Sequence, residues 1–288
     1  MTNRYHEPSF PLWLTHPSFA PWLKGIRETA FRFIVLMIFA QCLLSTFMNL
    51  VVGPTGFLQS IHIATDGWIN ATFLAYLPVY LVLGFLAWKI GRLRWNDFGM
   101  SWSKLAWGVL WTLIAWGITQ LTPFFLSDIE NVIRPEWSGH APAYLCDFIE
   151  GQFIANAMQE ELFFRVFLIS QVTLLLRRTF NCNWILALIG SVLVAGVIFS
   201  ICHIPNRIAG DDYGSITEAL SNQLHLLLMA IYFTMLFLLT NNIFIAVGIH
   251  ALVNSSPDIL TGTDFDFAAV LILLIFIIRA LWRWWTRV

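Results

Sequence analysis

Long apolar runs separated by short polar segments make up most of the chain. A bilayer core of about 30 Å is crossed by about 20 apolar helical residues. Runs of this kind fall at residues 30–52, 68–88, 105–126, 155–176, 183–203, 218–240, 242–256 and 267–284. The seventh is short, and the fourth follows a semi-polar stretch, Ala141 to Ile154, which we expect to lie along the interface or to re-enter the membrane. The pattern predicts an all-α, polytopic transmembrane helix bundle of about eight spans.

Composition supports this prediction and excludes other classes. The 288 residues include 16 basic and 17 acidic side chains, or 11% charged, against roughly 25% in soluble domains. Hydrophobic residues make up 58% and the mean hydropathy is +0.71, more apolar surface than one soluble core could bury. The net charge of −1 provides no basic surplus for nucleic acid. These values exclude a soluble enzyme, a disordered chain and a nucleic-acid-binding protein. The lipid bilayer is the expected surrounding.

The cysteines and the N-terminal residues add little. Cys42, Cys146, Cys182 and Cys202 show no C-x-x-C spacing, so we expect neither a disulfide framework nor a zinc knuckle. The first 19 residues contain three prolines and no clean apolar core, so they are not predicted to be a signal peptide.

The basic residues predict the orientation of the bundle. Cytoplasmic loops of membrane proteins carry an excess of Lys and Arg. With eight spans and both termini inside, thirteen basic residues fall on the cytoplasmic side: Arg4, Lys24, Arg27, Arg32, Lys89, Arg92, Arg94, Lys104, Arg177, Arg178, Arg279, Arg283 and Arg287. The opposite loops carry two, Arg134 and Arg207, and Arg165 lies within a span. A wrong span count would have distributed the basic residues over both sides of the membrane.

Three clusters of polar residues lie inside the predicted spans. Ionisable groups in membrane helices are costly, so each is a candidate for a functional site. The clusters are Glu160, Glu161 and Arg165 in the fourth span, Phe199 and His203 in the fifth, and His250 and Asn254 in the seventh. In the predicted topology all three lie in the non-cytoplasmic half of the membrane, as residues that act together would have to.

Helix geometry separates the two glutamates. Glu161 and Arg165 are four residues apart, on one helix face, and can form an ion pair that tunes the site or fixes the helix register. Glu160 is rotated by about 100° from Glu161, so it is free to act on water. His250 and Asn254 also share a face, and Phe199 could orient the ring of His203.

The three motifs, E-E-x-x-x-R, F-x-x-x-H and H-x-x-x-N, stand in this order on successive apolar helices. Together they resemble those of the CPBP family (CAAX prenyl endopeptidase and bacteriocin-processing, or Abi) of intramembrane glutamic proteases. The resemblance covers about residues 155–256, including the segment 240–254 and Ile204-Pro205-Asn206 after His203. One departure is Val166, where many family members have glycine after the arginine.

The resemblance implies a peptide hydrolase whose Glu160 matches the general base that activates water. His203 would help to hold and polarise that water, and His250 and Asn254 would stabilise the oxyanion. Hydrolysis requires a base, a bound water and donors aimed at developing negative charge, so these residue types suit the reaction. The implied partner is a peptide or protein substrate at the membrane, and no cofactor is expected. Neither a Ser or Cys nucleophile with a paired base nor an H-E-x-x-H motif is evident.

Three alternatives stay open. Glu160, Glu161, His203 and His250 could coordinate zinc, although the chain lacks a compact pair such as H-x-x-x-H. A proton-coupled transporter would use similar residues, but no repeated halves are visible. A non-catalytic scaffold or immunity protein would tend to have lost a motif residue.

The predicted topology also bears on the substrate and the division of the chain. A site near the non-cytoplasmic face fits exported or membrane-anchored peptides better than cytosolic prenylated tails. We expect a cytoplasmic or interfacial segment at 1–29, N-terminal spans at 30–140, the catalytic core at 141–256, and the last span with its anchor at 257–288. Oligomeric state does not follow from the sequence.

Overall fold

The computed structural model describes residues 23, 26–126, 133–134, 137, 141–210 and 212–286. Most of the N-terminal segment predicted at 1–29, with Arg4 and Lys24, lies outside these residues, and so does Arg287 of the charge count. Within the described part the fold is all-α, with one isolated antiparallel bridge between Ile133 and Leu260. The all-α part of the predicted fold class is therefore confirmed.

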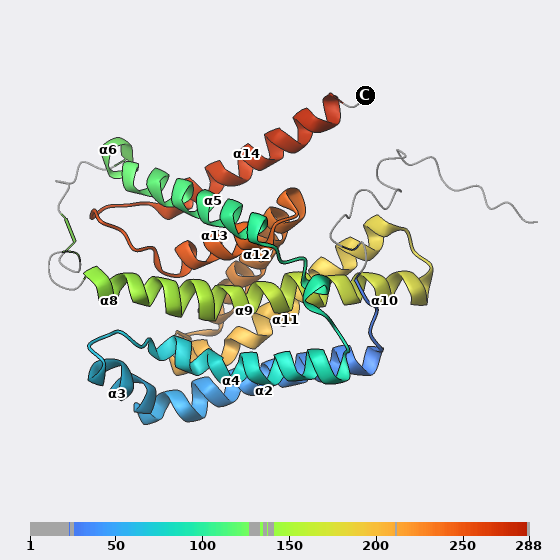
Figure 1. Ribbon diagram of the computed structural model, residues 1–288, viewed down its shortest axis with the longest axis horizontal. Coiled ribbons are helices and arrows are strands. Elements are labelled where there is room, and N and C mark those ends of the chain that lie inside the picture. The colour runs from blue at the N-terminus through green and yellow to red at the C-terminus, as the bar shows by residue number, and fades with distance from the viewer. Residues whose placement is uncertain are drawn as a thin grey trace, which may run out of the picture.

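Several of the described helices run roughly parallel or antiparallel to one another, and others cross them at an angle (Figure 1). Their bounds are α2 Phe31–Phe47, α3 Phe57–Ala64, α4 Ala71–Phe85, α5 Trp102–Leu121, α6 Pro123–Leu126, α8 Ala141–Cys146, α9 Met158–Glu160, α10 Ser170–Phe180, α11 Trp184–Ala209, α12 Ile216–Thr240, α13 Ile243–Ser255 and α14 Phe265–Trp285. Wider helical turns extend α2 to Val52 and α4 to Ile90. Thus each of the eight apolar runs contains a helix.

Polar side chains set where several helices begin. Asn70, Ser101, Asn183 and Ser215 each accept a hydrogen bond from the backbone N–H three residues later, and Asn242 accepts one from the N–H of Phe244. Such caps satisfy N–H groups that have no partner within the helix. Therefore α5 and α12 begin at their serine caps, a few residues before the apolar runs suggested.

The helix that carries the two glutamates is longer than its apolar run. The backbone is helical from Ala141 to Phe180 without a break, with wide i→i+5 turns at Asp147–Ala157 and Glu161–Ile169. The expectation that 141–154 forms a separate interfacial or re-entrant segment is therefore wrong. Such wide turns are rare and often occur at functional sites.

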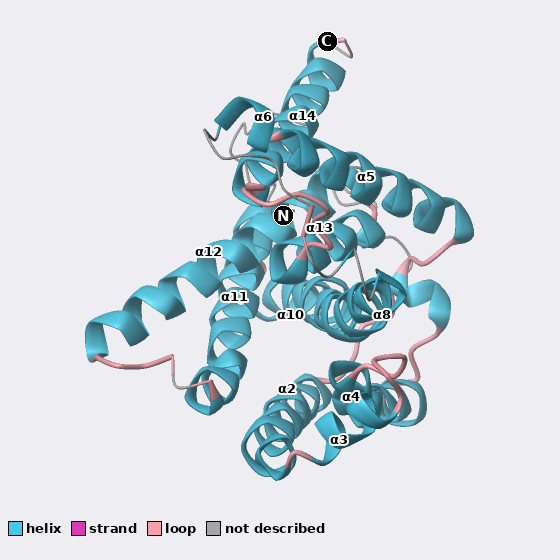
Figure 2. Ribbon diagram, turned by 90° about the vertical axis from the view of Figure 1, so that its left-hand side faces the viewer, coloured by secondary structure: helices cyan, strands magenta, loops and turns pink. Residues whose placement is uncertain are grey.

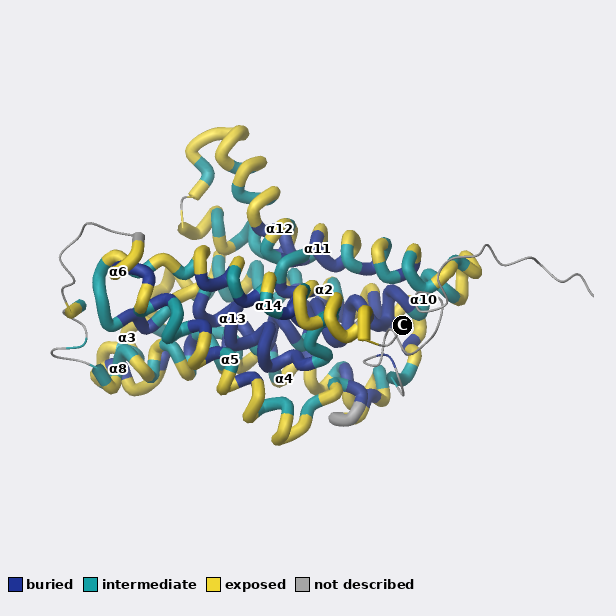
Figure 3. Tube along the Cα trace, turned by 90° about the horizontal axis from the view of Figure 1, so that it is seen from above, coloured by how far each residue is buried: buried dark blue, intermediate teal, exposed yellow. Residues whose placement is uncertain are grey.

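Six helical segments are long and apolar enough to cross a membrane among the described residues: Phe31–Thr55, Ala71–Ile90, Trp102–Phe125, Trp184–Ala209, Ile216–Thr240 and Phe265–Arg283. The helix 141–180 and the shorter α13 are not among these six. Both lie inside the bundle, as the view along the helices in Figure 2 and the buried trace in Figure 3 show. All residues from Ile243 to Leu252 are buried, and so are all but Leu162 of Glu161–Ile169. Enclosure by other helices allows these two helices to carry polar groups that lipid would not accept.

Helices α5 and α13 approach each other closely through glycine. A Cβ atom added at Gly248 would lie 1.6 Å from the Thr112 hydroxyl, and one at Gly108 would lie 2.3 Å from the Cβ of Phe244. Small residues allow this contact, as is common between membrane helices. The contact holds α13, and with it His250, within the bundle.

The two ends of the bundle differ in charge. At one end Arg178 pairs with Glu28 at 2.5 Å, and Arg27 lies 4.0 Å from Asp97 and donates to the carbonyl of Arg92. At the other end Arg134 lies 3.8 Å from Asp258. Thus Arg27, Arg92 and Arg178, far apart in the sequence, lie at one end of the bundle.

Candidate active site

The three polar motifs meet at one place within the bundle. Oε1 of Glu160 lies 3.5 Å from Nε2 of His203 on α11, and its Oε2 lies 3.7 Å from Nε2 of His250 on α13. Glu160 and His250 are buried, with 4% and 3% of their surface exposed, and His203 is half-buried. The sequence predicted that these motifs act together, and their proximity is confirmed.

The Glu160 carboxylate is held on one side and unpaired on the other. Its Oε1 accepts a hydrogen bond of 3.1 Å from the hydroxyl of Tyr76 on α4. Its Oε2 is buried and has no hydrogen-bond partner among the described residues. Direct hydrogen bonds to oxygen span about 2.7–3.2 Å, so both histidine nitrogens stand slightly too far away to bond directly. Oε2 is therefore the atom that can accept a proton from a small molecule placed between these groups.

His203 is anchored by the turn before it. Its Nδ1 lies 2.8 Å from the carbonyl oxygen of Phe199, and the two rings are 4.3 Å apart. A carbonyl oxygen accepts only, so the hydrogen of this bond is assigned to Nδ1 and Nε2 faces Glu160. The predicted role of Phe199 in orienting the imidazole is supported, with its backbone contributing as well as its ring. Helix α11 continues through Pro205 to Ala209, so His203 lies inside the helix and not at its end.

His250 is fixed by the second glutamate. Its Nδ1 lies 2.8 Å from Oε1 of Glu161, and its ring stacks on Phe233 at 4.2 Å between centroids. Because a carboxylate accepts, Nδ1 carries the hydrogen and Nε2 points toward Glu160. The two glutamates therefore have different surroundings, and Glu161 acts on His250 as well as on Arg165.

Arg165 neutralises Glu161 in the core. One guanidinium nitrogen lies 3.1 Å from Oε1 of Glu161, with 1% and 0% of the two side chains exposed. This confirms the predicted ion pair. The guanidinium carbon also lies 4.7 Å from the ring centre of Phe199 and 5.4 Å from that of Phe233, distances at which an aromatic face attracts a cation. Phe199 also contacts the ring of His203, and Phe233 that of His250, so the guanidinium and both imidazoles pack on the same two phenyl rings.

Asn254 is less closely connected than the other five predicted residues. It follows His250 by one turn of α13, and its side chain is exposed. Within the described part of the chain it makes no hydrogen bond. His250 and Asn254 share a helix face, as predicted, because both lie in α13. No described contact connects Asn254 with Glu160.

Sequence reasoning missed two polar residues near Glu160. Asn156 lies one turn earlier on the same helix, and its amide oxygen is 2.7 Å from the Tyr76 hydroxyl. The i, i+4 spacing from Asn156 to Glu160 could have identified it. No local signal points to Tyr76, because it is 84 residues away from Glu160 on α4.

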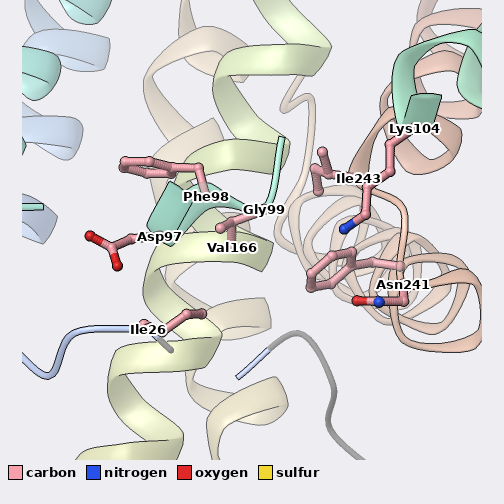
Figure 4. Close-up of a pocket in the computed structure, with 9 residues that line it drawn as sticks. Ile26, Asp97, Phe98, Gly99, Lys104, Val166, Asn241 and Ile243 are labelled. Atoms are coloured by element: carbon pink, nitrogen blue, oxygen red, sulfur yellow. The ribbon is translucent and has the colours of Figure 1, made fainter. Parts of the chain in front are cut away.

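Val166, the departure from the family pattern, lies away from the catalytic candidates. It is 4% exposed and lines a small pocket of about 20 Å³ together with Ile26, Asp97, Phe98, Gly99, Lys104, Phe237, Asn241 and Ile243. Figure 4 shows it beside the 97–99 turn and facing the start of α13. None of the six predicted site residues lines this pocket, so the change at Val166 concerns packing between helices.

The same geometry bears on zinc. Within the described ranges, no three His, Cys, Asp or Glu side chains are arranged so that they could hold a metal ion. Nε2 of His203 lies 3.5 Å from one carboxylate oxygen of Glu160, and Nε2 of His250 lies 3.7 Å from the other. Glu161 contacts Arg165 and His250.

Comparison with known proteins agrees with the site. The profile of the family "Type II CAAX prenyl endopeptidase Rce1-like" matches residues 142–256, a segment that contains all six predicted site residues. Neither a curated protein nor a solved structure matches the chain. Residues 142–256 therefore carry an Rce1-like type II CAAX prenyl endopeptidase domain, which is a peptidase domain of the CPBP (Abi) family.

Proposed function

We propose that this protein is an intramembrane endopeptidase in which Glu160 activates the water that hydrolyses a peptide bond. The carrying observation is the buried Glu160 carboxylate, with Oε1 held by Tyr76 beside His203 and Oε2 unpaired 3.7 Å from Nε2 of His250. The membership in a peptidase family supports the reaction class. A buried, oriented carboxylate with a free oxygen suits a general base.

In the proposed reaction, Glu160 takes a proton from water as the water oxygen attacks the carbonyl carbon of the substrate. The C–N bond of the tetrahedral intermediate then breaks, and the proton passes from Glu160 to the leaving amine. Nε2 of His203, 3.5 Å from Oε1 of Glu160, holds and polarises the water. Its backbone anchor at Phe199 fixes the direction of that nitrogen.

His250 and Asn254 stabilise the oxyanion in this proposal. A donor to the oxyanion needs a hydrogen on Nε2, while Glu161 already binds the hydrogen on Nδ1. His250 therefore acts as an imidazolium held between the two glutamates, and Arg165 balances the charge of Glu161. Asn254, exposed one turn further on, supplies its amide when substrate is bound. Donors aimed at developing charge in a water-poor site contribute strongly to catalysis.

The site faces the non-cytoplasmic side under an eight-span arrangement with both termini inside. The helix 141–180 and α13 are the fourth and seventh spans, enclosed by the six apolar ones. The meeting of Arg27 and Arg178 with residues of the 91–101 segment and the N-terminal segment supports this sidedness. The substrates are then exported or membrane-anchored peptides. Residues 30–140 and 257–288 support the core at 141–256.

A peptide-cleavage assay tests the function. Purified protein in detergent or vesicles, incubated with a library of membrane-associated and exported peptides, is expected to release defined fragments identified by mass spectrometry. Cleavage is expected to persist with a strong chelator. Loss with chelator and recovery with zinc would replace the glutamate mechanism by a metal mechanism. Binding without cleavage of any peptide would favour a scaffold.

Sidedness is tested by labelling two threonine-to-cysteine variants in a background whose four cysteines are serine. A membrane-impermeant maleimide added to intact cells is expected to label Thr261→Cys, in the loop before α14, and to leave Thr179→Cys, near the end of α10, unlabelled. After membrane permeabilisation both should react. Labelling of only the Thr179→Cys variant in intact cells would place the site toward the cytoplasm. Prenylated tails of cytosolic proteins would then be candidate substrates.

A further inference from the structure

Helix α4 contributes a side chain to the site, although it lies outside the residues that the family profile matches. The hydroxyl of Tyr76 lies 3.1 Å from Oε1 of Glu160 and 2.7 Å from the amide oxygen of Asn156. The match begins at residue 142, so the catalytic motifs alone do not account for this contact. Tyr76 comes early in α4, which packs along the wide turns that precede Glu160.

The single hydrogen of the Tyr76 hydroxyl must go to one of these two oxygens. Its hydroxyl has one hydrogen but contacts two oxygens, and it can donate to only one of them. A bond to an ionised carboxylate is roughly twice as strong as one between neutral groups, so the hydrogen goes to Glu160. The oxygen and nitrogen of an asparagine amide are assigned from such networks, and here the amide nitrogen of Asn156 belongs against the tyrosine oxygen. With the Asn156 amide turned in this way, the Gln152 amide, 3.4 Å away and one turn earlier, turns as well and donates its nitrogen to the Asn156 oxygen.

We propose that Tyr76 is a positioning residue for Glu160: it donates to Oε1, is itself oriented by Asn156, and keeps Oε2 facing Nε2 of His250. This inference rests on the proposed function and deepens it. Without the bond, the carboxylate can rotate about its last side-chain bond, and Oε2 no longer faces Nε2 of His250. The N-terminal spans would then help to position a catalytic residue, in addition to anchoring the protein in the membrane.

Tyr80 provides a matched control. It lies one turn after Tyr76 on the same face of α4, and its hydroxyl donates to the backbone carbonyl of Ile154 and lies 3.3 Å from that of Ala155. It therefore packs against the same helix with the same chemistry, but it contacts none of the site residues. A purely structural role of the tyrosines would make the two phenylalanine variants equivalent.

The test measures kcat and KM for the wild type, Tyr76→Phe and Tyr80→Phe on a peptide found in the library assay. Tyr76→Phe is expected to lower kcat about 10- to 100-fold, the effect of losing a bond to a charged group, with KM changed less than about threefold. Tyr80→Phe should change kcat less than about threefold. Asn156→Ala should lower kcat in the wild type but add little in the Tyr76→Phe background, because the two act through one contact.

An infrared measurement keeps the inference testable even if no peptide is cleaved. The carboxyl band of Glu160, identified by its loss in Glu160→Gln, is expected to shift in Tyr76→Phe and to stay in place in Tyr80→Phe. Equal bands in the two variants, or equal kcat values, would overturn the role of Tyr76. A shifted band in a protein that cleaves nothing would instead support the positioning and contradict the proposed function.

Discussion

Replacing Glu160 with glutamine is expected to lower kcat by about 10³-fold or more, because the glutamine amide cannot take a proton from water. General-base catalysis contributes about 10²–10⁴-fold. Glutamine keeps the shape of the side chain, and its oxygen can still accept from Tyr76. The folded state should remain, and its melting temperature should change little, since Oε2 of Glu160 has no hydrogen bond to lose. Kinetics and thermal unfolding of the purified variant measure both effects.

Glu150→Gln is the matched control for Glu160→Gln. Glu150 lies on the same continuous helix, and its carboxylate accepts from the backbone N–H of Asn70, outside the site. Its replacement should leave kcat within about threefold. A Glu160→Gln enzyme with more than a tenth of the wild-type kcat would show that another group is the base. A loss of activity that parallels a loss of folded protein would assign Glu160 to stability.

The sequence predicted the helices better than their ends. Each apolar run contains a helix because about 20 apolar residues in lipid have no other way to satisfy the backbone. The residues at which the helices begin and end depend on polar caps such as Ser101 and Ser215, and on enclosure by other helices. Hydropathy measures neither of these. The stretch 141–154 was misjudged because it is semi-polar, yet it is surrounded by protein on several sides: it packs against α4 and α13.

The candidate site was predictable where the contacts repeat the helical spacing. Glu161 with Arg165 and Phe199 with His203 are four residues apart, and both contacts are observed. The bond from His250 to Glu161 and the contact of Tyr76 with Glu160 join helices distant in sequence, so periodicity cannot indicate them. The different surroundings of the two glutamates were anticipated from their rotation of about 100° along the helix. Only the packed bundle reveals that Glu161 also binds the catalytic histidine candidate.

Replacing Arg165 with methionine is expected to destabilise the fold by about 3–5 kcal/mol, the cost of removing one partner from a buried ion pair. The change leaves the Glu161 carboxylate, with none of its surface exposed, bonded to His250 alone. It also removes a cation packed on Phe199 and Phe233. Thermal or denaturant unfolding in one detergent measures the loss, and activity should fall with it because His250 is no longer held.

Two further variants show whether the charge itself is responsible. Arg178→Met removes an ion pair with Glu28 in which 54% and 39% of the side chains are exposed, so it should cost at most about 1 kcal/mol. The double variant Glu161→Gln with Arg165→Met removes both buried charges and should recover part of the stability lost in Arg165→Met. It should not recover activity, because glutamine does not hold His250 as an imidazolium. If Arg165→Met were no less stable than Arg178→Met, the buried pair would not hold the core together, and its place beside His250 would be explained by catalysis alone.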